Sequence, residues 1–358
     1  MLNKIWTFLR NKYFLMILRL TVAAFFLWWV MKDIRFSELK KLTWHGLLIG
    51  VIAAAACVLF QVYLTALRWR MLLKSQKISI SVFRALSLTF QGSMFSMFMP
   101  GGAVGGDVLK AAFLTRETRS GQKIEGVTTI FLDRVIGMMG LFLLVLISGA
   151  CCLRQILDFK PEICLLVLIL LAVCLAGLLA GLVLLFQDLF FRIRFFAFLL
   201  NKADGLVHGS LTRILKSVEV CRRDRKTLLL AFAASLLLLH PLLIFSAFLV
   251  MRGVSGGFPS ILTGSLSFSL GSTASVAPVT PGGLGTRDKV IEVLLQSFGV
   301  DPGIASLTPI LYSIVLLSAP LLGIVFFLLD LRARHPEEPE KTTAGPEEFP
   351  DPPLLRGK

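Results

Sequence analysis

Long apolar stretches recur along this chain, and they constrain its fold more than any other feature. A helix needs roughly 20 apolar residues to cross a hydrocarbon core of about 30 Å. The sequence provides such stretches repeatedly, for example at Leu165–Phe186 and Leu228–Val250. These runs are continuously apolar and do not alternate with polar residues. They therefore predict membrane-spanning helices, in which the backbone polar groups are satisfied within each segment.

Composition and charge support a membrane protein and argue against other classes. Hydrophobic residues make up 56% of the chain and charged residues only 16%, whereas an average soluble domain carries about 25% charged residues. The formal net charge is +15, but the basic residues lie between apolar runs, as membrane topology requires. We therefore expect no nucleic-acid partner.

The sequence offers no support for a cofactor, a metal or a catalytic centre. Most of the six cysteines lie in or beside apolar runs without a CxxC pair, and the four histidines are far apart. These patterns favour small apolar filler over a disulfide framework or a metal site. Walker A and HExxH motifs are also absent, so transport by this chain would be downhill or driven by an ion gradient.

The apolar pattern predicts an all-α polytopic fold with about six full spans and two broken ones. The full spans are expected at about 13–32, 46–67, 126–151, 162–186, 227–250 and 304–330. The first ends near Trp28 and Trp29, and we interpret it as a retained signal anchor. Two further apolar stretches, 82–99 and 258–280, each end in a Pro-Gly-Gly break before a short charged segment. This pattern is typical of a discontinuous membrane helix or re-entrant loop.

The two breaks resemble each other. Pro100–Lys110 reads PGGAVGGDVLK and Pro281–Lys289 reads PGGLGTRDK, and we align them with one gap. Basic loops at 68–84 and 187–226 belong on the cytoplasmic side. This orientation makes the two breaks enter from opposite sides, as in an inverted-repeat transporter.

The topology also places both termini in the cytoplasm of a bacterial inner-membrane protein. Residues 1–332 then form the transmembrane domain. Residues 333–358 have too little apolar content to pack, so we expect a disordered cytoplasmic tail.

Both breaks are candidate anion-binding sites. A glycine-rich turn that leads into a helix exposes backbone N–H groups and the positive end of the helix dipole. We expect Asp107 and Thr286 to cap these two helices, with Lys110 on the same helical face as Asp107. The alternative interpretation is two capped helix ends with flexible loops. The complete set of candidate substrate-binding residues is Gly101, Gly102, Gly105, Gly106, Asp107, Lys110, Asp133, Arg134, Gly282, Gly283, Gly285, Arg287 and Asp288.

Asp133 and Arg134 enter this set because they lie inside the apolar run Val127–Ala150. A charge at the centre of a span costs about 2.5–3.5 kcal/mol on insertion scales. Adjacent helical residues diverge by about 100°, so we expect each to pair with a broken helix or with a bound anion. The alternative is that both extend to the membrane interface. His240-Pro241 predicts a kink, and a hydrogen bond from His240 to a neighbouring helix is favoured over proton relay.

Four motifs in order resemble a known family. They are Leu67-Arg68-Trp69, Met99–Ala111, Leu132–Gly137 and Pro281–Asp288. Together they resemble the transmembrane flippase region of lysylphosphatidylglycerol synthases, over nearly the whole chain to about residue 332. The resemblance implies a stand-alone member without the soluble aminoacyltransferase domain, and such members are linked to hopanoid, glycolipid or glycosyl-carrier pathways.

The preferred function is therefore a lipid flippase or transporter, whose partner is a membrane lipid with a polar or phosphate headgroup. The alternative is a membrane-embedded accessory or glycosyltransferase-like subunit acting on lipid-linked sugars or hopanoids, and a structural scaffold is a third hypothesis. The sequence leaves the lipid, the coupling ion and the oligomeric state open.

Overall fold

The computed structural model describes residues 44–98, 103–118, 122–185, 218–220, 224–257, 260–276 and 280–334. These residues form helices and short connections, without strands, so the all-helical class is confirmed for them. The α-helices are α4 (Trp44–Ser75), α5 (Val82–Phe98), α6 (Ala103–Glu117), α7 (Lys123–Cys151), α8 (Leu153–Leu157), α9 (Pro161–Leu185), α13 (Arg225–Ala234), α14 (His240–Ser255), α15 (Ile261–Ala274), α16 (Thr286–Ser297), α17 (Pro302–Leu316) and α18 (Ser318–Arg334). A π-helical turn, η2 (Ser235–Leu239), joins α13 to α14, and a 3₁₀ turn, η3 (Pro281–Gly283), precedes α16.

Five helical segments in the described ranges are long and apolar enough to cross a membrane. They are Trp44–Ser75, Lys123–Cys151, Pro161–Leu185, Arg225–Ser255 and Pro302–Asp330. Five of the six predicted full spans are thus confirmed. The sixth, at 13–32, lies outside the described residues, as do Gly101 and Gly102 and the predicted tail from residue 335.

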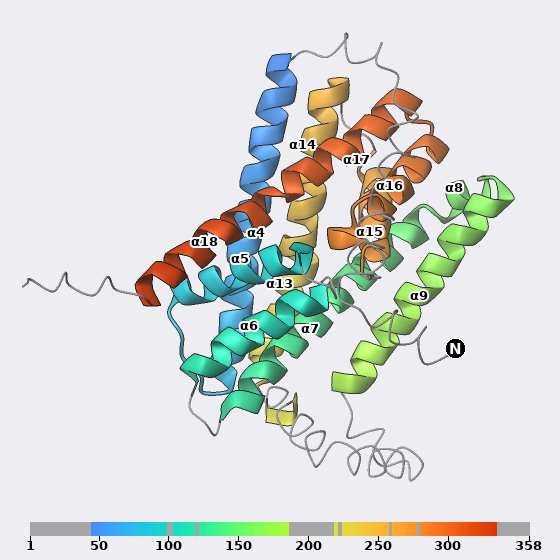
Figure 1. Ribbon diagram of the computed structural model, residues 1–358. Coiled ribbons are helices and arrows are strands. Elements are labelled where there is room, and N and C mark those ends of the chain that lie inside the picture. Colours follow the sequence, from blue (N-terminus) through green and yellow to red (C-terminus); the bar gives the residue numbers. More distant parts are fainter. Residues whose placement is uncertain are drawn as a thin grey trace, which may run out of the picture.

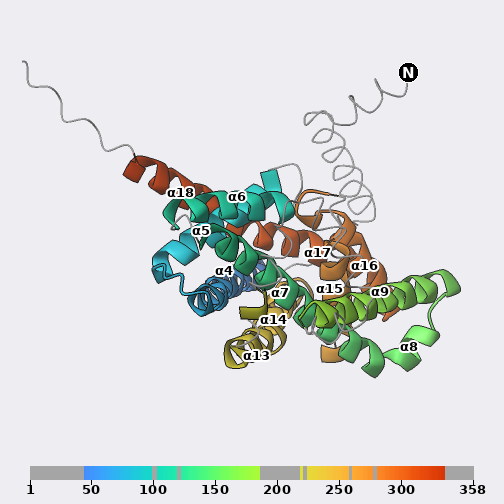
Figure 2. The ribbon, with the colours of Figure 1, turned by 90° about the horizontal axis from the view of Figure 1, so that it is seen from below.

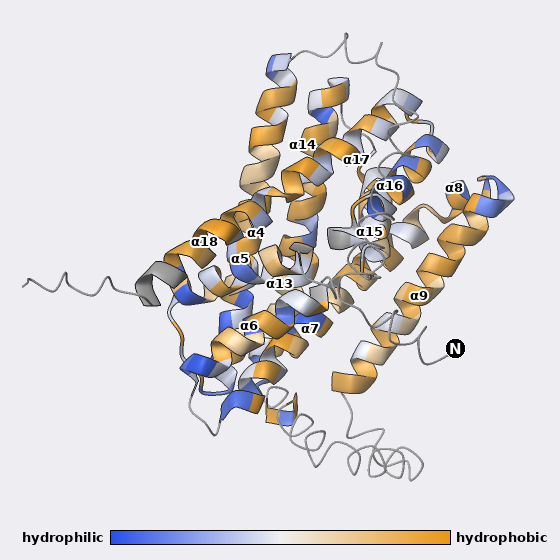
Figure 3. Ribbon diagram, in the orientation of Figure 1, coloured by the Kyte–Doolittle hydropathy of each residue, from blue (hydrophilic) through white to orange (hydrophobic). Residues whose placement is uncertain are grey.

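Two of the long helices, α4 and α14, pack along each other. Figure 1 shows α4 and α14 side by side, with α9 at one edge of the molecule and α18 extending to the other, and Figure 2 shows the same order from below. A Cβ added at Gly50 of α4 would lie 2.7 Å from the carbonyl oxygen of Leu249 of α14. Small residues allow such close approach of helices in a membrane. Figure 3 shows apolar residues along most of these helices and hydrophilic residues at the lower ends of α6 and α7.

Two short helix pairs, α5–α6 and α15–α16, flank the two Pro-Gly-Gly breaks. In each pair the helices meet at a glycine: a Cβ at Gly106 of α6 would overlap Ser96 of α5, and a Cβ at Gly271 of α15 would overlap Ile291 of α16. With 17 and 14 residues, α5 and α15 are shorter than the five candidate spans. Each of these two helix pairs therefore forms a compact hairpin.

The second break has a left-handed backbone. Gly282, Gly283 and Gly285 have φ values of 60°, 74° and 81°, a region that residues with a Cβ avoid. Gly105, in contrast, lies inside α6. Glycine is therefore required by backbone geometry in η3 and its connection to α16, whereas in α6 it serves helix packing.

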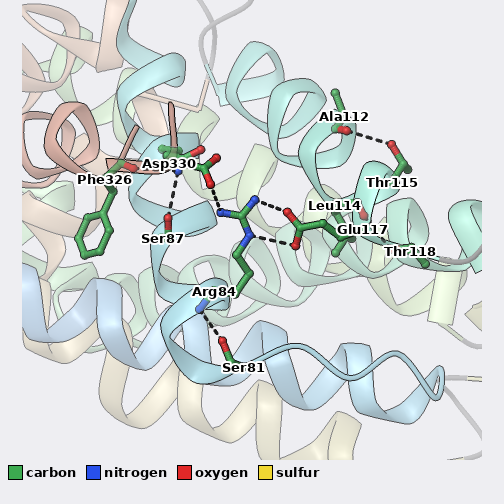
Figure 4. A network of polar contacts seen from close by, with 11 residues as sticks. Ser81, Arg84, Ser87, Ala112, Leu114, Thr115, Glu117, Thr118, Phe326 and Asp330 are labelled. Atoms are coloured by element: carbon green, nitrogen blue, oxygen red, sulfur yellow. Dashed lines mark hydrogen bonds and ion pairs between the residues drawn. The ribbon is translucent and has the colours of Figure 1, made fainter. Parts of the chain in front are cut away.

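The α5–α6 hairpin is fastened to the C-terminal helix α18. Arg84 of α5 donates from Nε to Glu117 of α6 at 3.0 Å and from Nη1 to Asp330 of α18 at 2.9 Å (Figure 4). Nearby, the rings of Phe90 and Phe326 stack with centroids 5.2 Å apart. One arginine thus links three helices at the end of the hairpin.

Candidate functional site

A cavity of about 740 Å³ lies between the α5–α6 hairpin, α7 and the second Pro-Gly-Gly break. Residues from α5, α6, α7, the end of α15 and the second break line it, and α5 packs directly against η3. The lining residues are Ser96, Val104, Asp107, Val108, Ala111, Val127, Ile130, Phe131, Arg134, Met138, Ser275, Val276, Thr280, Gly282 and Gly283. Segments about 180 residues apart in the sequence thus enclose one space.

One ion pair lies on the cavity wall. Arg134 of α7 donates to both carboxylate oxygens of Asp107, from Nε at 2.6 Å and from Nη2 at 3.2 Å. The Arg134 and Asp107 side chains are 45% and 25% exposed. The expectation that Asp107 caps its helix is wrong, because α6 begins four residues earlier at Ala103. Its carboxylate instead holds the guanidinium at the cavity.

The neighbouring Asp133 is bound on another side of α7. Arg68 of α4 donates from Nε to the Asp133 carboxylate at 2.9 Å and from Nη2 to its backbone carbonyl at 3.2 Å. A third hydrogen bond joins Arg68 Nη1 to the hydroxyl of Ser235 in η2. Both ionic side chains are buried, and Gly137 leaves room for the guanidinium. The expected partner on a broken helix is present for Arg134, which pairs with Asp107 of α6, whereas Asp133 pairs with Arg68 of the full span α4.

Sequence reasoning did not include Arg68 and Ser235 among the candidates. The motif Leu67-Arg68-Trp69 was the available signal for Arg68, because an arginine near the end of an apolar span needs compensation. Ser235 gave no comparable signal, since only the fold brings it to Arg68.

Lys110 lies behind the cavity wall and does not line it. Its residue exposure is 6%, and its Nζ sits 3.6 Å from the centroid of the Trp69 ring, a cation–π geometry. Trp69 is itself fixed by a hydrogen bond from its Nε1 to Thr129 at 3.2 Å. The lysine is therefore next to the site and almost completely buried.

The charges of the second motif are internally satisfied. Arg287 and Asp288 are 6% and 0% exposed, and both bond to the hydroxyl of Ser313 on α17. Asp288 also accepts from the backbone N–H of Gly285 at 3.0 Å. The predicted cap Thr286 is wrong, because Gly285 is the N-cap residue. Of the second motif, the glycine backbone lines the cavity and the charged pair does not.

His240 meets the expectation of a structural hydrogen bond. Its Nε2 lies 2.9 Å from the carbonyl oxygen of Gly137 on α7. The π-helical turn η2 comes directly before His240-Pro241, where proline removes a backbone donor. This irregular turn also presents Ser235 to Arg68.

The site combines an apolar wall with a localised charge pair. Val104, Val108 and Phe131 are 66%, 61% and 48% exposed and line the same cavity as Asp107 and Arg134. Within the described ranges no group of three or more His, Cys, Asp or Glu residues could hold a metal ion. Such a site can hold a polar headgroup at the ion pair while apolar chains remain against the exposed side chains.

The fold and this cavity define a multi-pass helical membrane protein. Residues 16–323 match the family model described as the lysylphosphatidylglycerol synthase TM region, and the chain belongs to that family. The resemblance seen in the four motifs is thereby confirmed.

The chain is also similar to the UPF0104 membrane protein PH1989 of Pyrococcus horikoshii. The two are 24% identical over 129 residues, which cover 36% of this chain and 37% of that protein. The chain thus matches little more than a third of the length of this relative. No solved structure matches the chain.

Proposed function

We propose that this protein is a lipid flippase or transporter that moves an anionic or polar-headgroup lipid between the leaflets of a bacterial inner membrane. The observation that carries the proposal is the cavity enclosed by the α5–α6 hairpin, α7 and the second Pro-Gly-Gly segment. It places one accessible ion pair among exposed apolar side chains.

In this proposal the cavity receives the headgroup. The planar guanidinium of Arg134 suits a phosphate, and Asp107 holds it in place through two hydrogen bonds. At Gly282 a Cβ would have no other atom within 4 Å, so the backbone there borders open space for a ligand. The acyl chains stay in the bilayer along Val104 and Val108, which are largely exposed.

We further propose that the two hairpins are re-entrant parts of an inverted repeat. Asp107 follows Pro100 by seven residues, and Asp288 follows Pro281 by seven residues, so the motifs align without the gap first assumed. The helix contacts also repeat in the two halves. In the first half α4 packs on α5 and α7, and in the second half α14 packs on α15 and α17. Each half also packs on the other, because α5 contacts α18 and α15 contacts α7. Repeats of this kind rock against each other around a central site in transporters.

The inverted repeat supports the orientation expected from the basic loops, with both termini in the cytoplasm. The end of the molecule that carries Lys74, Lys77, Arg116 and Lys123 would then face the cytoplasm. These side chains are exposed, which suits contact with water and lipid headgroups.

A paired assay separates this function from the alternative of an enzyme subunit acting on lipid-linked sugars or hopanoids. The purified full chain is incubated with candidate lipids in detergent, and the lipids are analysed by mass spectrometry. The same preparation is reconstituted into liposomes, and movement of fluorescent phosphatidylglycerol between leaflets is followed by quenching from outside. We expect unaltered lipids in the first assay and movement faster than in protein-free liposomes in the second. A new lipid product without movement would instead support the enzyme.

A further inference from the structure

Five charged side chains gather where α4, α6 and α7 meet beside the cavity. The two carboxylates are already bound, Asp107 to Arg134 and Asp133 to Arg68. The fifth group, Lys110, is close enough for its ammonium to experience all four of these charges. When Lys110 is protonated, three cations face two anions. The cluster therefore carries one excess positive charge, and that charge belongs to Lys110.

The surroundings of Lys110 do not compensate this charge. Within the described part of the chain its contact with a polar or aromatic group is the face of Trp69, and its side chain forms no hydrogen bond or ion pair there. On the α5 side Gly92 lies beside the lysine, because a Cβ added there would lie 3.7 Å from Lys110 Cδ. The charged groups that face the lysine are thus Arg68 from α4, Asp107 from α6, and the adjacent pair from α7.

A charge held away from water without an ionic partner is costly, and a group that can lose its proton commonly does so. Lysine has this option and arginine does not. With a neutral Lys110 the four remaining charges sum to zero, so an empty site would be electrically neutral. With a protonated Lys110 and one bound monoanionic headgroup, the site would again be neutral.

From this balance we infer that Lys110 binds the proton that couples headgroup loading to pH, so that an anionic lipid and one proton move together. The inference rests on the proposed function of the same cavity. On loading, the amine lone pair of Lys110 forms an N–H bond to a proton taken from water, and the resulting ammonium balances the phosphodiester anion. On release the N–H bond breaks, the electron pair returns to nitrogen, and the proton passes to water as the lipid leaves.

This coupling would let a proton gradient drive lipid transport by a chain that has no Walker A motif. A proton gradient across the membrane would move an anionic lipid from the more acidic side to the more alkaline side. Neutral empty and neutral loaded forms would both avoid carrying a net charge through the hydrocarbon core, where ionisable groups are expensive.

The test is a calorimetric titration of the purified full chain with short-chain phosphatidylglycerol. The titration is repeated at several pH values between about 7 and about 10, near the ordinary pKa of lysine of about 10.4, and in two buffers with different ionisation enthalpies. The phosphodiester does not titrate in this range. We expect uptake approaching one proton at the alkaline end and a Kd that rises by up to about tenfold per pH unit there.

Two substitutions assign the proton. Lys110→Arg keeps a permanent charge, so binding should persist and proton uptake should fall to zero. Lys289→Arg is the matched control, because Lys289 is paired with Glu292 at 2.9 Å, and it should leave uptake unchanged. Thermal unfolding shows that each variant is folded.

The outcomes separate the inference from the proposed function. Binding by the wild type with no proton uptake at any pH overturns the inference and leaves the headgroup site standing. Uptake that persists in a folded Lys110→Arg variant also overturns it, since another group must then take the proton. A folded wild type that binds no phosphatidylglycerol contradicts the proposed site itself.

Discussion

Arg134 and its neighbour Asp133 point to different partners, and only Arg134 reaches the cavity. Arg134 pairs with Asp107 of the α5–α6 hairpin, whereas Asp133 is buried against Arg68 of α4. These two adjacent residues of α7 therefore have different roles. Asp133 fastens α7 to the helices behind it, and Arg134 presents a held guanidinium to the cavity between the α5–α6 hairpin and the second break.

Substitution of the two candidate arginines, Arg134 and Arg287, should therefore have different effects. Arg134→Ala should retain thermal stability near the wild type and lose most lipid translocation, because its side chain is 45% exposed and lines the cavity. Arg287→Ala should lower stability by about 3–5 kcal/mol, since it leaves the buried Asp288 without its cation. Melting temperature in detergent and translocation in liposomes are measured on both. The reverse pattern would place the headgroup at the second motif.

Two glycines offer a second comparison. Gly106→Ala should destabilise the protein by about 1–3 kcal/mol, because the new Cβ overlaps Ser96 and the Gly92 carbonyl of α5. Gly282→Ala should cost about 1–2 kcal/mol through its positive φ alone, while its methyl group enters the cavity. Translocation per folded molecule should hence fall more in Gly282→Ala. Equal translocation per folded molecule in both variants would show that the second break is only a turn.

The sequence predicted the spans well and the site only in part. Continuous apolar runs identify membrane helices because a single local property, hydropathy, decides them. Arg134 and Asp107 were found because their motif and their position in an apolar run are also local features. The partners of Arg68 were not found, since Asp133 and Ser235 lie 65 and 167 residues away along the chain.

The second motif shows why similar sequence did not give a similar environment. Asp107 and Asp288 stand at the same distance from their prolines, yet Asp288 is fully buried. Ser313 of α17 bonds to both members of the Arg287–Asp288 pair, and the Tyr312 ring lies 5.6 Å from the guanidinium carbon. Nothing in the motif itself encodes these contacts from α17. The predicted helix caps Asp107 and Thr286 were also wrong. A glycine can be the N-cap residue without a side-chain hydrogen bond, as Gly285 is for α16.

The opening of the cavity can be tested with a bulky apolar residue. Val108→Trp should reduce translocation several-fold without lowering the melting temperature, because Val108 is 61% exposed at the cavity wall. Leu179→Trp is the control, since Leu179 lies on α9, away from the lining, and is 52% exposed. If both variants transport lipid at the wild-type rate, the acyl chains do not pass this side of α6.

Substitutions of Arg84 and of its two partners, Asp330 and Glu117, should lower the stability of the protein by different amounts. Arg84→Ala should cost about 1–3 kcal/mol, because it removes three charged hydrogen bonds at once and leaves the largely buried Asp330 without this partner. Glu117→Gln should cost no more than about 1 kcal/mol, since the Glu117 side chain is 35% exposed. Melting temperatures of these two variants and of Asp330→Asn, which should fall between them, test the order. An Arg84→Ala variant as stable as the wild type would show that packing alone holds α18.

The central claim is that the Asp107–Arg134 pair receives the lipid headgroup, and the double variant Asp107→Asn/Arg134→Gln tests it most directly. This change removes both charges together and keeps a polar side chain at each position, so neither partner is left as an uncompensated charge. The measurement is the rate at which fluorescent phosphatidylglycerol crosses the bilayer of liposomes containing equal amounts of folded wild type or variant. We predict a melting temperature within a few degrees of the wild type and a translocation rate at least about tenfold lower, the loss expected when a charge-assisted contact of about 1.5–3 kcal/mol is removed. A folded double variant that moves the lipid at the wild-type rate would contradict the account.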